Sequence, residues 1–352
     1  MNTVTSIRRV LPLALCALAF STTRAADSDS AANRTYDVTR TIKVGGIGGW
    51  DYLTVDGPHK LLFVPRSTHT MVLDSTSGYV VADIKGQGRN HGVALAANAA
   101  RGFISDGADG SVVVFSLDSY AVLGRVKVAA DADGIVYDAY SDKVLVVCGD
   151  SGVVVPISPE VDPVNGLADP PVELGGKPEY LTVDGKGSAF INLVDKNEVA
   201  VLDTKHMKVV NRWSTAPGGS PVGMSIDREG RRLFVGCRKP QVLVVMDADS
   251  GSVLASLPIG AGVDATHFDH GDAFASCRDG TLAVARQTSP GRFEIVQTVK
   301  TAPGARTMGV DHYTHTLYLP TAEFLPADPA GGRPTAKPDT FKIVVVAPMG
   351  GT

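Results

Sequence analysis

The chain has 352 residues, of which 44% are hydrophobic and 20% charged, and its net charge is -4. Residues 1–25 contain Arg8, Arg9 and Arg24 and no acidic residue, so the rest of the chain holds 30 basic and 37 acidic residues, a net charge of -7. This acidic balance argues against nonspecific nucleic-acid binding, which depends on positive charge.

Residues 1–25 are predicted to be a secretory signal peptide. Arg8 and Arg9 form a basic start, residues 10–20 an apolar run, and residues 23–25 (TRA) a small-residue cleavage pattern. The apolar run of about 11 residues is too short to span a bilayer, which needs about 20. The sequence therefore predicts a periplasmic or secreted protein without a membrane span. Residues 26–35 are polar and are predicted to be disordered.

Residues 36–44 (YDVTRTIKV) are predicted to form a strand that lies before the first of seven repeats. The last repeat has only three predicted strands, at 307–311, 316–320 and 341–347. We therefore expect the N-terminal strand to complete the last repeat, which hides sheet edges that would otherwise pair with other chains.

The first repeat, residues 49–86, contains four short predicted strands separated by turns rich in Gly, Ser, Asp and Pro. The copies align on the Asp or Ala that closes the first strand and on a large apolar residue seven positions later, or five in the sixth copy. The aligned pairs are Asp56/Phe63, Ala96/Phe103, Asp138/Leu145, Asp184/Ile191, Asp227/Phe234, Asp269/Phe274 and Asp311/Tyr318. In the fourth pair Phe190 fits as well as Ile191.

The repeats follow one another at intervals of 40 to 46 residues. Four strands within such a period are typical of a propeller blade. A single blade cannot bury both faces, so the copies must stack into one domain, residues 36–352. The sequence predicts an all-β fold: a seven-bladed β-propeller of four-stranded antiparallel blades, with the N-terminal strand closing the last blade. Insertions at 156–171 and 321–340 lengthen the third and seventh blades, and no segment is predicted to be helical.

One position per repeat, at the start of the first strand, is expected to line the mouth of the central channel. The residues at this position are Asp51, His91, Asp133, Glu179, Val222, Asp264 and Arg306. The next inward row is almost wholly apolar and consists of Leu53, Val93, Ile135, Leu181, Met224, Thr266 and Met308. A polar ring above an apolar floor is a common form of ligand site.

The polar ring is predicted to be either a ligand or metal site or a solvated rim. Two unit charges about 5 Å apart repel by roughly 3 kcal/mol at an effective dielectric constant of about 20. Clustered carboxylates therefore require a cation, a proton, an arginine, or separation by water. The candidate metal ligands are Asp51, His91, Asp133, Glu179 and Asp264. Carboxylates with one imidazole favour calcium, magnesium or manganese over structural zinc.

A second set of residues, three positions after the aligned apolar residue, is expected on the same rim. It consists of Arg66, Asp106, Cys148, Cys237, Cys277 and Thr321. Arg238 and Arg278 directly follow two of the cysteines. The candidate ligand-binding residues are therefore Asp51, Asp133, Asp264, Arg66, Arg238 and Arg278. The three cysteines are interpreted as buried small apolar residues, and at most one pair of them can be bridged.

Most of the remaining histidines are expected at the opposite rim, in a structural role. His267 and His270 have the spacing of a metal-binding pair, but strand alternation points their side chains in different directions. The sequence contains no HExxH, no Walker-type glycine loop and no convincing serine elbow.

Several motifs together resemble those of exported YVTN-repeat, YncE-like propellers. They include GGWDYLTVD (48–56), HGVAL (91–95), KPEYLTVDGKG (177–187) and GARTMGVD (304–311). The chain departs from that pattern at the final Asn of the Tyr-Val-x-Asn ending. The residues at this position are Arg66, Asp106, Cys148, Cys237, Cys277 and Thr321. The resemblance implies a seven-bladed propeller and export, and no single reaction, because the family has no uniform activity. Related propellers include lactonases with a site at the channel mouth.

Two functions follow from this reading. In the first, a monomeric propeller binds a small ligand or metal at the channel mouth, as a lactonase-like hydrolase if it is an enzyme. His91 or Glu179 would then activate water, and Arg306 or a metal would stabilise the oxyanion. In the second, the propeller is a non-catalytic scaffold that recruits a protein of the cell envelope.

Overall fold

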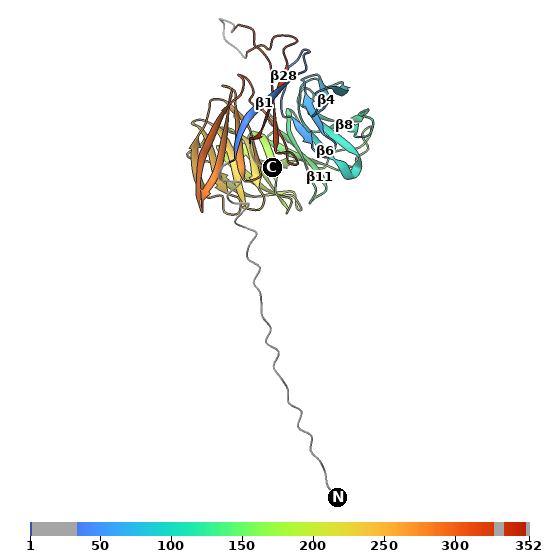
Figure 1. Ribbon diagram of the computed structural model, residues 1–352. Helices are drawn as coiled ribbons and strands as arrows, with labels where there is room; N and C mark the ends of the chain where they lie inside the picture. Colours follow the sequence, from blue (N-terminus) through green and yellow to red (C-terminus); the bar gives the residue numbers. More distant parts are fainter. Residues whose placement is uncertain (2–33, 327–333, 350–352) are drawn as a thin grey trace.

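Seven sheets of four antiparallel strands surround a central axis in the computed structural model, which describes residues 1, 34–326 and 334–349 (Figure 1). This confirms the predicted seven-bladed, all-β architecture. Within the described residues, the one helical segment is a 3₁₀ turn, η1 (Ala97–Ala99). Apart from Met1, the predicted signal peptide lies outside the described residues, as do residues 26–33 of the segment predicted to be disordered.

The blades follow one another along the chain. Blade 1 contains β2 (Thr54–Asp56), β3 (Leu61–Pro65), β4 (His69–Asp74) and β5 (Val80–Lys85), and blade 2 contains β6 (Asn90–Ala96), β7 (Arg101–Asp106), β8 (Ser111–Ser116) and β9 (Val122–Lys127). Blade 3 contains β10 (Ala132–Asp138), β11 (Lys143–Cys148), β12 (Val153–Ile157) and β13 (Val172–Glu173), and blade 4 contains β14 (Pro178–Val183), β15 (Ser188–Leu193), β16 (Glu198–Asp203) and β17 (Lys208–Ser214). Blade 5 contains β18 (Pro221–Asp227), β19 (Arg232–Arg238), β20 (Gln241–Asp247) and β21 (Val253–Pro258), and blade 6 contains β22 (Val263–Asp269), β23 (Asp272–Cys277), β24 (Thr281–Ser289) and β25 (Arg292–Lys300).

Blade 7 joins the two ends of the chain. Its strand order is β1 (Thr35–Lys43), β28 (Lys342–Met349), β27 (Thr316–Thr321) and β26 (Gly309–Asp311), so the N-terminal strand closes the last blade as predicted. Figure 1 shows β1 beside β28. The start of β1 is also bound to blade 6, because the Tyr36 hydroxyl donates to Asp272 Oδ2 at 2.8 Å and Arg34 Nη1 lies 3.1 Å from the same atom. Arg286 donates to both oxygens of this fully buried carboxylate.

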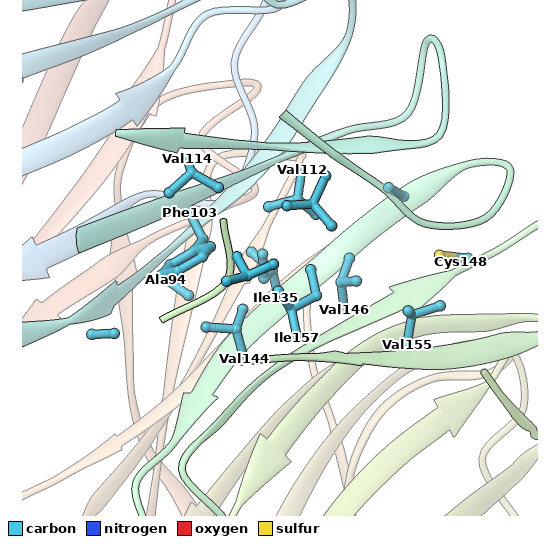
Figure 2. Close-up of a cluster of buried hydrophobic side chains, with 14 of the residues drawn as sticks. Ala94, Phe103, Val112, Val114, Ile135, Val144, Val146, Cys148, Val155 and Ile157 are labelled. Carbon is cyan, nitrogen blue, oxygen red and sulfur yellow. The ribbon is translucent and has the colours of Figure 1, made fainter. Parts of the chain in front are cut away.

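The hydrophobic core is divided among the interfaces between blades. Seven clusters of buried side chains occupy the seven interfaces, one cluster for each pair of neighbouring blades. Figure 2 shows the cluster between blades 2 and 3, where Phe103 and Val114 face Ile135 and Val144. The apolar residues of each strand thus stabilise the ring only when the adjacent blade is present, which explains why the repeats form one domain.

The predicted apolar floor of the channel is wrong. Leu53, Val93 and Ile135, from the row assigned to that floor, instead belong to clusters between blades, as do Leu181, Met224 and Met308. The error arose because the first strand of a blade also packs against its neighbours, so its alternate side chains enter the interfaces. In blade 4 Thr182 pairs with Phe190, as Thr54 pairs with Phe63 in blade 1. Phe190, and not Ile191, is therefore the residue equivalent to Phe63.

The two insertions lie where they were expected. Residues 158–171 connect β12 to β13, and residues 322–341 connect β27 to β28. The described ends of the second insertion form a bridge between Phe324 and Ala336 and project from one end of the ring (Figure 1). Phe324 packs against Trp50, with 6.1 Å between ring centroids. Within the described residues, no helix has the length and apolar character needed to cross a membrane.

Arg66, a predicted ligand-binding residue, does not face the channel. Its side chain is fully buried, lies over the Phe341 ring at 3.7 Å and donates to the carbonyl oxygens of Gly45, Ile47, Gly48 and Gly49. These residues form the connector between blades 7 and 1, in which Gly48 has a φ of +102° and leaves no room for a Cβ beside the Arg66 carbonyl. Burial lowers the pKa of Arg66 to about 10. Arg66 therefore holds the connector in place.

We expect Arg66→Met to lower the free energy of unfolding by about 2 kcal/mol, because it leaves four carbonyl groups without their charged donor. Chemical denaturation would measure this change. Arg292→Ala is the matched control, since the ion pair of this exposed arginine is with the exposed Glu294. Equal stability of the two variants would contradict the structural role of Arg66.

Candidate functional site

The ring of ionisable residues predicted at the channel mouth sits on a repeated irregularity of the first strands. In blades 2 to 6 the pairing of the first and second strands shifts register at or beside the ring residue, for example between Asn90 and Val93 around His91 and between Ala132 and Ile135 around Asp133. A bulge of this kind re-aims a side chain out of the regular strand alternation. In blades 1 and 7, Asp51 and Arg306 precede the first regular strand pair.

Three residues of the ring meet. His91 Nδ1 lies 2.7 Å from Asp51 Oδ2 and 3.5 Å from Asp133 Oδ1, and the side chains of the three residues are 13% to 20% exposed. Each offers one possible ligand atom, and the three atoms lie within 4.8 Å of one another. Asp51, His91 and Asp133 come from three successive blades, so the packing of neighbouring blades brings them together.

The protonation of this triad is set by its own charges. Burial alone would lower the pKa of His91, but its hydrogen bond to Asp51 and the charges of Asp133 and Asp51 outweigh burial and raise the pKa to about 9. Burial also raises the pKa of Asp133 well above its usual value, although His91 opposes that rise. At neutral pH, His91 is therefore an imidazolium between carboxylates and is not ready to act as a general base.

Two polar atoms of the triad are left without a hydrogen-bond partner. His91 Nε2 and Asp133 Oδ1 are both buried, and neither has a hydrogen-bond partner among the described residues. A Cβ built on Gly107 would lie only 3.0 Å from His91 Nε2, so a glycine at that position leaves space beside the imidazole. Buried polar groups are normally satisfied, and an unsatisfied group in a native structure points to an unseen water, ion or ligand.

The carboxylate of Asp264 forms ion pairs with two arginines. Arg306 Nε donates to Asp264 Oδ2 at 2.5 Å, and Arg238 Nη2 donates to Oδ1. Arg306 also donates to the Trp50 carbonyl oxygen at 3.3 Å. Asp264 is thus a poor candidate for the predicted metal ligand, and Arg306 and Arg238 neutralise a carboxylate of the ring instead of facing the triad.

Glu179 and two tyrosines complete the ring. Burial raises the pKa of Glu179, and the charge of Asp264 adds to the rise. Tyr52 and Tyr180 come from blades 1 and 4, so their contact, with 4.7 Å between ring centroids, crosses the channel. Burial raises the pKa of Tyr52, and the charges of Asp133, Glu179, Asp264 and Asp51 raise it further.

The two tyrosines were not predicted as site residues, although a repeated motif distinguishes them. Each directly follows a ring acid in a repeated motif, DYLTVD at 51–56 and EYLTVD at 179–184. The equivalent position is Gly92, Gly134 and Gly223 in blades 2, 3 and 5, where a Cβ would crowd the next blade. Only the two tyrosines therefore project large side chains from this position.

The other predicted residues lie outside this centre. Arg278 is exposed in the turn after β23, and Val222 is buried between blades 5 and 6. Cys148, Cys237 and Cys277 are buried and unbridged, in agreement with their interpretation as small apolar residues. Burial raises the pKa of Cys148 to about 11, so its thiol is not activated.

Comparison with known proteins supports the fold. A solved structure described as Kuenenia stuttgartiensis Hydrazine Synthase matches with a TM-score of 0.68 and 13% sequence identity, over 78% of this chain and 92% of that chain. In all, 1596 solved chains match, so the likeness shows a common architecture and carries no activity. No family model and no curated protein matches the chain.

Proposed function

We propose that this protein binds a divalent cation at the ring of the central channel, with Asp51, His91 and Asp133 as its protein ligands. The observation that carries the proposal is the meeting of these three side chains within 4.8 Å, with Asp133 Oδ1 buried and without a hydrogen-bond partner. Two carboxylates and one imidazole suit manganese best, because imidazole favours transition metals and carboxylate favours magnesium, calcium and manganese.

The spacing of the triad fits such an ion after a small adjustment. Neighbouring ligand atoms around an octahedral ion with bonds of about 2.1 Å lie about 3 Å apart. Nδ1 of His91 is 2.7 Å from Asp51 Oδ2 and 3.5 Å from Asp133 Oδ1, which brackets that value. The cation would replace the proton that Nδ1 now shares with the carboxylates.

Charge balance supports the same conclusion. Counted with all four acids ionised and His91 protonated, the ring holds four negative charges against one imidazolium and the guanidinium groups of Arg238 and Arg306. Exchanging the imidazolium proton for a divalent cation brings the net charge of this set from one negative charge to zero. A cation would thereby relieve the repulsion that raises the pKa values of Asp133 and Glu179.

A hydrolytic activity at this site is supported by one further feature. The raised pKa of Glu179 suits a general base that must take a proton from water near neutral pH. His91 is protonated at neutral pH and Arg306 is engaged by Asp264, so Glu179 is the best base among the predicted catalytic residues. Lactonase-like hydrolysis therefore depends on the cation site and on Glu179.

The setting that we propose is the periplasm or the cell exterior, on the grounds of the predicted signal peptide and the resemblance to YncE-like propellers. The alternative scaffold function is favoured by two exposed apolar residues, Ile47 and Leu325, which are 72% and 44% exposed. Ile47 belongs to the connector between blades 7 and 1, and Leu325 to the insertion between β27 and β28. An envelope protein could bind there without using the cation site.

The affinity for Mn²⁺ is expected to rise about tenfold per pH unit between pH 6 and pH 8. The reason is that His91, with a pKa of about 9, must lose its proton when the cation binds. Titration calorimetry of protein dialysed against a chelator would measure this slope.

Asp133→Asn should abolish Mn²⁺ binding while Asp203→Asn should not, since Asp203 pairs with the exposed His206 at the surface, at 2.8 Å. An affinity that does not change with pH, or equal affinities of the two variants, would overturn the proposed cation site. Binding of Ca²⁺ or Mg²⁺ with higher affinity than Mn²⁺ would correct the identity of the ion.

A further inference from the structure

A cavity lies at the opposite end of the channel from the ring of ionisable residues. It has a volume of about 640 Å³ and is lined by residues of β14, β18 and β22, by the turns that follow β18 and β22, and by His312 in the turn after β26. Thr182, Ser225 and His267 occupy one repeat position in blades 4, 5 and 6, three residues beyond the ring position, which corresponds to about 10 Å along a strand. The contact between Tyr52 and Tyr180 crosses the channel near the ring.

The groups that line this cavity are rich in hydrogen-bond acceptors. Ser225 is 7% exposed, and its hydroxyl is buried without a partner. His267 Nε2 lies 3.1 Å from the Met308 carbonyl oxygen and so must carry the hydrogen. Burial lowers the pKa of His267 to about 4, so the ring is neutral and Nδ1 is left as an acceptor.

A second imidazole, that of His312, also lines the cavity. His312 Nδ1 lies 2.8 Å from Asp269 Oδ1 and therefore donates, which leaves its Nε2 as an acceptor when the ring is neutral. The other oxygen of Asp269 accepts from His315 at 2.8 Å, so this buried carboxylate fixes the orientation of both histidines.

The cavity is also acidic. Three carboxylates, those of Asp227, Glu229 and Asp269, line it together with one guanidinium, that of Arg228. Arg228 donates to the Val183 carbonyl oxygen and forms no ion pair with these acids within the described residues. One wall is Phe268, whose ring stacks on Phe234 with 5.3 Å between centroids.

We propose that this cavity binds a small primary ammonium compound, such as an aliphatic diamine. An ammonium group carries three donors and one positive charge, which matches the partnerless Ser225 hydroxyl, the acceptor Nδ1 of His267 and the excess of carboxylates over guanidinium groups among the described lining residues. The proposal is independent of the cation site, because no residue of the ring lines this cavity.

Ser225→Ala separates binding from folding. The substitution removes a buried hydroxyl that has no partner, so we expect the variant to be at least as stable as the wild type. Its affinity for 1,4-diaminobutane should nevertheless fall about tenfold, because a hydrogen bond to a charged donor is lost. Titration calorimetry and thermal melting on the full chain would give the two readouts.

Glu229→Gln tests the charge, and Glu160→Gln is its control, an exposed acid outside the cavity with the same change in net charge. We expect weaker diamine binding only in Glu229→Gln, and no binding of 1,4-butanediol or tetramethylammonium to the wild type. Equal binding of the diol, or diamine binding that survives both Ser225→Ala and Glu229→Gln, would overturn the proposal. Diamine binding that is lost only in Asp133→Asn would place the amine at the ring and would overturn it as well.

Discussion

A chain that begins at Gly45, and therefore lacks β1, is expected to lose its cooperative unfolding transition. β1 pairs with β28 along its whole length and supplies Tyr36 and Ile42 to two different clusters between blades. Its loss also leaves Asp272 and Arg286 without Tyr36 and Arg34 at the junction with blade 6. Burial of two large side chains contributes about 1.5–3 kcal/mol each, so their loss alone costs about 3–6 kcal/mol, which is comparable with the lower range of the stability of a whole domain, about 5–15 kcal/mol.

A chain that begins at Arg34 is the matched control, because it retains β1 and every described contact of its first residues. This control should melt at the temperature of the longer chain. A synthetic peptide of residues 34–44, added to the chain that begins at Gly45, should restore the transition by pairing with β28. A truncated chain that melts with the control would show that β1 does not hold the ring closed.

The closure of the ring was predictable because it follows from counting. Seven copies of a four-strand pattern with three strands in the last copy leave one position, and residues 36–44 are the only predicted strand that can take it. The alternation of apolar and polar residues is a local signal, so each strand can be predicted from its own residues without knowledge of its neighbours. The blades were therefore predicted to within a few residues, although the first strands of blades 1 and 7 are shorter than expected.

The candidate site was less predictable, because it depends on contacts that cross the channel. The alignment placed Asp51, His91 and Asp133 on one ring, but only the bulges at the starts of the first strands decide which ring side chains meet. Arg66 and Arg306 are both arginines, yet Arg66 holds the connector between blades 7 and 1 and Arg306 pairs with Asp264. The contact between Tyr52 and Tyr180 depends on the diameter of the channel, which no local pattern encodes.

His91→Ala is expected to lower the free energy of unfolding by about 3–5 kcal/mol near neutral pH, because it leaves the buried carboxylates of Asp51 and Asp133 without their cation. The rise in the pKa of His91 from 6.5 to about 9 corresponds to roughly 3 kcal/mol, which agrees with that range. Urea denaturation between pH 6 and pH 10 would measure the difference between wild type and variant.

The sign of the pH dependence follows from the direction of the shift. The folded protein holds the His91 proton more tightly than the unfolded chain, so this stabilisation is complete below pH 6.5 and is lost as the pH rises through about 9. The cost of His91→Ala should therefore shrink toward its packing contribution above pH 9. His206→Ala, which removes an exposed histidine with the same contact to an aspartate, should leave the stability unchanged at every pH.

The same variant links stability to the proposed cation. His91→Ala retains both carboxylates of the triad, so millimolar Mn²⁺ should recover part of the lost stability by supplying the missing positive charge. The recovery should be absent in the double variant with Asp133→Asn, which retains only one carboxylate. A loss of stability that is the same at pH 6 and pH 10 and does not respond to Mn²⁺ would mean that His91 acts through packing alone, and that the ring is a solvated rim rather than a cation site.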